Sequence, residues 1–172
     1  MITKSNLLLI FTFALGYLSC NKGTPAGFWQ NFKENLLIKN ISDQGPYGGR
    51  RIMYWKTEKI NTFDSKTIIG FAIKNGWKLI DSLAFNQNQV SKWTYDNTPI
   101  FPLSHTGFSD TITNNSTYKH FPRWINGQIK IYKFKTGWVA IEPGTDNSIE
   151  GNGFVVVNEN ENEMSVYHLW GE

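Results

Sequence analysis

Cysteine is almost missing from this sequence of 172 residues, because Cys20 is the only one. A single thiol excludes an internal disulfide, so packing and hydrogen bonds alone must stabilise the fold. Basic runs are missing as well, and the formal net charge is only +3. That balance excludes a nucleic-acid binder held by many phosphate contacts.

Hydrophobic runs long enough to cross a bilayer are also missing. The longest apolar run, residues 7–18, has about 12 residues, whereas a membrane-spanning helix needs roughly 20. Metal ligands are sparse, since His105, His120 and His168 are far apart and form no i, i+4 pair. We therefore expect no metal site and no cofactor.

The first twenty residues follow the three-part plan of an export signal. Lys4 supplies a positive charge, residues 7–18 are apolar, and Ser19 and Cys20 form a small-residue exit. The sequence Leu18-Ser19-Cys20 behind the apolar run resembles the signal of bacterial lipoproteins. The alternatives are an uncleaved apolar anchor and an ordinary export signal with a free cysteine.

This resemblance implies that the Cys20 thiol takes a diacylglycerol, that the peptide before it is removed, and that the new amino terminus is acylated. Tyr17 departs from the Leu that usually stands three residues before the cysteine. Asn21 is not the Asp that retains lipoproteins in the inner membrane, which favours the outer membrane. We expect a signal peptide over residues 1–19, a lipidated tether over 20–27, and a single globular domain over 28–172, all in the bacterial cell envelope.

The pattern of the domain's first half predicts mixed structure. Apolar residues from Phe28 to Leu37 recur at helical spacing, although a strand could begin at Leu36. Residues 43–49 contain Gly and Pro and predict a loop, and residues 51–56 predict a strand. Residues 65–76 fit a helix capped at Asp64 or Ser65 better than a hairpin, because the apolar residues repeat with a period near 3.6.

The second half predicts strands. Residues 77–85 form one, with Trp77, Leu79, Leu83 and Phe85 on one side, and residues 86–123 predict long irregular connections. Four short strands follow at residues 128–134, 138–141, 154–158 and 164–170, separated by turns. In the last, Met164, Val166, His168 and Trp170 share one face, and the apolar run 155–157 belongs near the middle of the sheet. The fold class is α+β: an antiparallel sheet with a C-terminal β-meander and one or two helices packed on one face.

Catalytic patterns are weak. Ser104, His105 and Asp110 gather in one segment, but nothing resembles the elbow that exposes a nucleophilic serine. Residues 146–151 match only the first half of a calcium loop, and the twelfth position is Val157, so we interpret them as a hairpin loop. His168, which alternates with apolar neighbours, is interpreted as a hydrogen-bonded core histidine.

Aromatic residues are abundant, with 7 Trp, 7 Tyr and 12 Phe. Most must pack in the core, and exposed ones anchor protein partners or stack on sugars. The candidate residues for a protein contact are Tyr47, Arg50 and Arg51, beside a protruding loop. Those for a glycan groove are Trp93, Tyr95, Tyr118 and Trp124.

Three functions follow from these patterns. The first is a non-catalytic binding module in the envelope that engages a protein partner, for instance an immunity-type inhibitor of a toxin. The second is a glycan-binding or glycan-processing protein, for which Asp96, Asp110 and Glu142 are available carboxylates. The third is a structural envelope lipoprotein without a soluble ligand.

Overall fold

The fold is built around one twisted antiparallel sheet. In a computed structural model, which describes residues 25–45, 48–104, 107–108, 121–137 and 152–171, six strands lie in the order β1-β2-β11-β10-β9-β3. All neighbours pair antiparallel. The sheet strands are β1 (Leu37–Gly45), β2 (Gly48–Lys56), β3 (Lys78–Phe85), β9 (Ile129–Lys135), β10 (Gly153–Asn158) and β11 (Glu163–Gly171).

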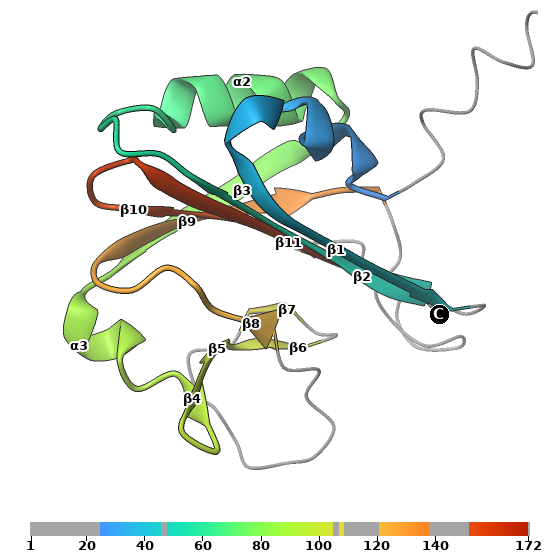
Figure 1. The fold of residues 1–172 in the computed structure, drawn as a ribbon. Helices are drawn as coiled ribbons and strands as arrows, with labels where there is room; N and C mark the ends of the chain where they lie inside the picture. Colours follow the sequence, from blue (N-terminus) through green and yellow to red (C-terminus); the bar gives the residue numbers. More distant parts are fainter. Residues whose placement is uncertain (1–24, 46–47, 105–106, 109–120, 138–151, 172) are drawn as a thin grey trace, which may run out of the picture.

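Helical elements cover one face of this sheet (Figure 1). They are the 3-10 helices η2 (Gly27–Asn31) and η3 (Glu34–Leu36) and the α-helix α2 (Ser65–Lys74). Ile68 and Ala72 of α2 and Trp29 of η2 are buried in a cluster with the sheet residues Met53 and Val166. The helix predicted over residues 65–76 is therefore confirmed and ends at Lys74, with its apolar stripe turned to the sheet.

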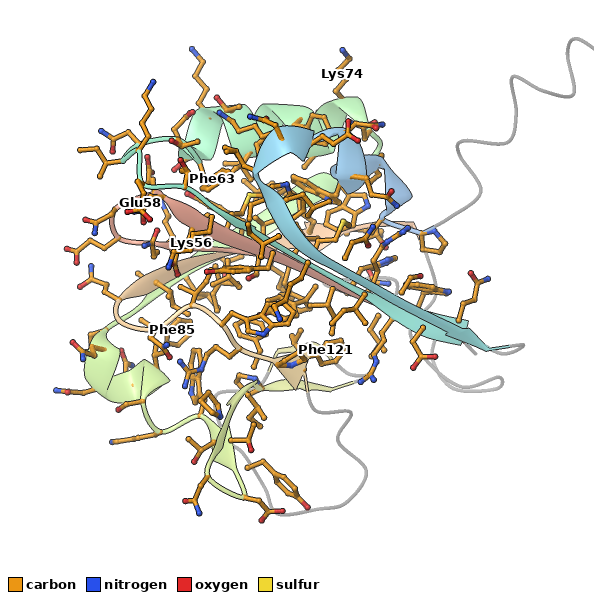
Figure 2. The ribbon with its side chains drawn as sticks, in the orientation of Figure 1. Lys56, Glu58, Phe63, Lys74, Phe85 and Phe121 are labelled. Atoms are coloured by element: carbon orange, nitrogen blue, oxygen red, sulfur yellow. The ribbon has the colours of Figure 1, made fainter. Side chains whose placement is uncertain are left out.

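A second layer packs against the opposite face. It contains α3 (Gln87–Val90) and the short strands β4 (Thr94–Tyr95), β5 (Thr98–Phe101), β6 (Leu103–Ser104), β7 (Gly107–Phe108) and β8 (Phe121–Pro122). Val90, Phe101 and Phe121 pack there against the sheet residues Val156 and Tyr167. Figure 2 shows Phe63 on the α2 side of the sheet and Phe85 and Phe121 on the other side. The described residues of segment 86–123 thus contribute a layer of core, where the sequence predicted irregular connections.

The C-terminal strands form the predicted meander. β9, β10 and β11 are neighbours in both sequence and space, so the α+β class with a C-terminal meander is confirmed. Residues 155–157 lie on β10, an interior strand, as predicted. Met164 and Val166 belong to the cluster on the α2 face, and Tyr167 and Leu169 to the opposite one. Predicted strand 138–141 lies outside the described residues.

Three predictions about local structure need correction. Residues 43–45 and 48–49 are strand, because the β1–β2 ladder continues to Gly45 and Gly48. Residues 27–36 form two 3-10 helices, not an α-helix. The predicted tether 20–27 extends too far, since Pro25 and Ala26 are already buried.

The prediction that Trp77, Leu79, Leu83 and Phe85 share one side is also wrong. The β3–β9 register shifts between Leu79 and Asp81, which makes a bulge at Ile80. Leu79 pairs with Phe134 and Trp77 packs in the cluster on the α2 face, whereas Leu83 and Phe85 face the second layer. One extra residue reverses the alternation of every side chain beyond it.

Candidate functional site

Several residues singled out from the sequence lie outside the described residues. These are Cys20, Tyr47, His105, Asp110, Tyr118, His120, Glu142 and the segment 146–151. Of the remaining candidates, Trp93 is 3% exposed and packs edge-on against Phe85 and Phe101. Arg51 is 7% exposed and donates from Nε to Asn40 Oδ1 over 3.3 Å. Both therefore belong to the interior, and neither offers a broad surface to a ligand.

Two other candidates, Arg50 and Trp124, lie on the sheet face that the second layer covers. Arg50 is opposite Asp43 in the β1–β2 hairpin, and their side chains form an ion pair with Nε and Oδ2 at 3.5 Å. Lys39 is opposite Tyr54 on that same face. We name Lys39, Ile41, Asp43, Arg50, Tyr54 and Trp124 the hairpin strip.

Trp124 reaches the hairpin strip because the second layer holds the chain after β8 in place. Arg123 Nε donates to Ile100 O at 3.2 Å, and its Nη1 donates to Asn126 Oδ1 at 2.7 Å. The Tyr167 hydroxyl donates to Pro122 O at 2.9 Å. These bonds join β5 and the sheet strand β11 to the segment that carries Trp124.

Aromatic and charged groups contact one another along the strip. The rings of Trp124 and Tyr54 lie 5.5 Å apart, and Lys39 Nζ lies over the Trp124 ring at 5.3 Å. This geometry is that of a cation–π contact. Beside Tyr54, Lys56 Nζ and Glu163 Oε1 form an ion pair at 2.7 Å. Burial raises the pKa of Tyr54, and the Glu163 carboxylate adds to the rise, so its phenol stays protonated at neutral pH.

The strip has the chemistry of a binding surface. Trp and Arg are among the residue types that contribute most to protein interfaces, and here the half-buried Trp124 and Arg50 adjoin the exposed side chains of strand β1. Tyr54 is itself buried and packs against the ring of Trp124. Sequence reasoning missed these β1 residues because it placed Asp43 in a loop at 43–49 and assigned no strand to Lys39 and Ile41. Residues 39–43 contain one apolar residue, Ile41, so they carry no apolar–polar alternation that would have predicted a strand.

His168 is a second polar centre, buried on the α2 face. Asn152 Nδ2 donates to Leu169 O, so Asn152 Oδ1 accepts from Thr136 Oγ1 at 2.7 Å. The Thr136 hydroxyl donates its only proton to Asn152, so it must accept a hydrogen bond from His168 Nε2, 3.1 Å away. The ring lies between Trp77 and Trp170, with centroids at 5.4 and 5.1 Å. The prediction of a hydrogen-bonded core histidine is confirmed.

This histidine is not suited to proton transfer near neutral pH. Burial, with a smaller contribution from the charge of Arg51, lowers the pKa of His168 to about 3. Its ring is fully buried, and Arg51 is directly opposite it on β2. The cluster therefore links Thr136, which follows β9, and Asn152, which precedes β10, to β11 through a neutral imidazole.

Within the described ranges, no group of three or more His, Cys, Asp or Glu residues is placed to hold a metal ion. Among the same residues, no helix combines the length and apolar character needed to traverse a bilayer. No protein-family model matches the chain, and comparison with the curated proteins and with the solved structures yields no significant match. The hairpin strip is thus the strongest candidate site among the described residues.

Proposed function

We propose that this chain is a non-catalytic binding module of the bacterial envelope, anchored by lipid on Cys20, which engages a protein partner through the hairpin strip. The observation that carries this proposal is the joining of Trp124, Tyr54 and Lys39 beside the exposed strand β1. An inhibitor of an incoming toxin is one form that such a module would take.

A protein partner fits the strip better than a glycan does. Stacking on a sugar needs a free aromatic face, and Lys39 already lies over the ring of Trp124. The charges of the strip alternate, with Lys39, Asp43 and Arg50 spaced along two neighbouring strands. A protein surface of complementary charge can match such a pattern. Electrostatic attraction also steers such a partner to the strip before contact.

Site-specific photocrosslinking in intact cells tests the proposal. A photoreactive phenylalanine analogue replaces Trp124 in the full chain, and the matched control carries it at Ile60, which is exposed and outside the strip. We expect a crosslinked species containing a different protein from position 124 only. The substitution R50E should weaken that product, because it places two carboxylates opposite each other in the hairpin.

Two results would count against a protein partner. One is a product that appears equally from positions 124 and 60, which indicates random contact. The other is the absence of any heterologous product together with tryptophan quenching by envelope polysaccharides, which would favour the glycan hypothesis.

A further inference from the structure

Strand β1 is an open edge of the sheet. It ends the strand order, and every residue from Ile38 to Gly45 is exposed, including Ile38 at 59% and Ile41 at 39%. Figure 1 shows β1 along the outer border of the sheet, with β2 as its neighbour. An edge of this kind presents backbone N–H and C=O groups to any strand that can pair with it.

The sequence of β1 is complementary to itself. If two β1 strands pair antiparallel about Ile41, Lys39 lies opposite Asp43 of the partner subunit. By the twofold symmetry, Asp43 lies opposite Lys39 of the partner subunit. Asn40 then lies opposite Ser42 of the partner subunit, and the two Ile41 side chains meet at the axis. Opposite charges directly across an antiparallel pair stabilise it, and their Cβ atoms are about 5 Å apart.

Other arrangements lose these pairs. A shift of two residues in either direction places Lys39 opposite Ile41 or Gly45 of the partner subunit, with no charge match. Parallel pairing in register brings two lysines together and two aspartates together, which is repulsive. The charges of β1 thus favour a single register.

The bulge at Ile38 leaves this register intact. It interrupts only the start of β1, and the ladder from Lys39 to Gly45 is regular. The opposite edge of the sheet differs, because the bulge of β3 at Ile80 is near its middle, and Asp81 Oδ1 accepts from Ser82 N at 2.7 Å. A pairing that uses β1 in both copies closes on itself and does not propagate into a fibre.

We infer that two copies of this chain associate through β1, antiparallel about Ile41, so that one continuous sheet runs through both. This inference goes beyond the proposed function and does not depend on it. In the dimer the two hairpin strips meet at the axis, which gives a single surface with twofold symmetry. Lys39 and Asp43, which form the β1 side of the strip in one copy, become central in the pair.

Engineered cysteines test the register. In full chains carrying C20A, so that no other thiol remains, I41C places two thiols at the axis. Opposed Cα atoms there are about 4.5–5.5 Å apart, within the range for a disulfide. I38C is the matched control, an exposed isoleucine on the same strand whose two copies would be about 20 Å apart at six residues of offset. After mild oxidation in detergent, we expect the I41C chain to form a dimer at least tenfold more completely.

Charge reversal tests the pairing itself. K39E should weaken association about tenfold or more, as measured by light scattering over a concentration series, because two attractive pairs become repulsive. D43K should act similarly, and the double variant K39E/D43K should associate more tightly than either single one. K66E, on the exposed surface of α2, should change nothing, and circular dichroism confirms that each variant is folded.

A wild-type chain that stays monomeric at the highest soluble concentration overturns the inference, as does equal crosslinking of the I38C and I41C chains. Failure of the double variant to recover association would mean that the charges do not set the register. None of these outcomes affects the photocrosslinking result, which concerns a different protein, so the two proposals fail separately.

Discussion

At the scale of the residue, His168 links the stability of the fold to pH. The unfolded chain binds a proton at this ring near the ordinary histidine pKa of about 6.5, whereas burial keeps the folded pKa at about 3. The effect of His168 on the free energy of unfolding is therefore fully favourable above pH 6.5, and it is lost as the pH falls from 6.5 toward 3. The loss from this group is at most about 1.4 kcal/mol per pH unit.

We expect the free energy of unfolding, measured by urea titration between pH 7 and pH 4, to fall steeply for the wild-type chain. H168Q retains an N–H that can reach Thr136 and removes the titrating ring, so its curve should be flatter over the same range, from a lower starting stability. Parallel curves for the two proteins would show that other groups cause the acid sensitivity.

The placement of single residues was only partly predictable. Strand alternation was enough to assign His168 to a buried face, because its neighbours Val166 and Trp170 are apolar on that face. Trp93 and Arg51, which were named as candidate contact residues at the surface, are instead buried. Their burial depends on what packs over them from distant parts of the chain, and a local pattern does not contain that information.

At the scale of the element, α2 begins at a defined cap. Asp64 Oδ1 accepts from the backbone N–H of Thr67 at 2.9 Å, and this bonding lowers the pKa of the Asp64 carboxyl. D64A leaves that N–H without its partner and should reduce the free energy of unfolding by about 1 kcal/mol. D64N keeps an acceptor and should lose much less. Thermal unfolding of the three proteins side by side measures both effects, and an equal loss in D64A and D64N would refute the capping role.

Elements with strong local signals were predicted well, and those set by pairing were not. The spacing of Ile68 and Ala72 and the cap at Asp64 specify α2 without any partner. The β3 bulge at Ile80 arises from the ladder with β9, so the sequence of β3 alone predicted an unbroken alternation. The strand residues at Asp43 and Gly49 were likewise missed, because glycine and proline nearby indicated a loop.

At the scale of the whole molecule, the proposal depends on Cys20 joining the domain to a membrane. If it does, C20A should release the protein from the membrane fraction after gentle lysis, and it should abolish incorporation of labelled fatty acid. Wild-type protein provides the reference, and K66E serves as a substitution that leaves the anchor unchanged. Persistent label in the C20A protein would refute lipid attachment at this residue.

The molecular architecture was predictable as a class but not in its layers. The short strands of the C-terminal third and the turns between them were sufficient to predict an antiparallel meander. The covering of the second sheet face by the described residues of segment 86–123 was not foreseen, because the strands there are only two to four residues long. The hairpin strip depends on that layer, since β5 holds the segment that carries Trp124 in place, so the site could not be assembled from sequence.

The position of β11 has a consequence for biosynthesis. Although β11 comes after all the other strands in sequence, it lies between β2 and β10 and supplies residues to both hydrophobic clusters. Until the ribosome has translated as far as residue 171, the β1–β2 hairpin and the β3–β9–β10 group have no strand to join them. The two groups can therefore join into one sheet only after β11 has been synthesised, so the strand order delays completion of both hydrophobic clusters until the last strand is available.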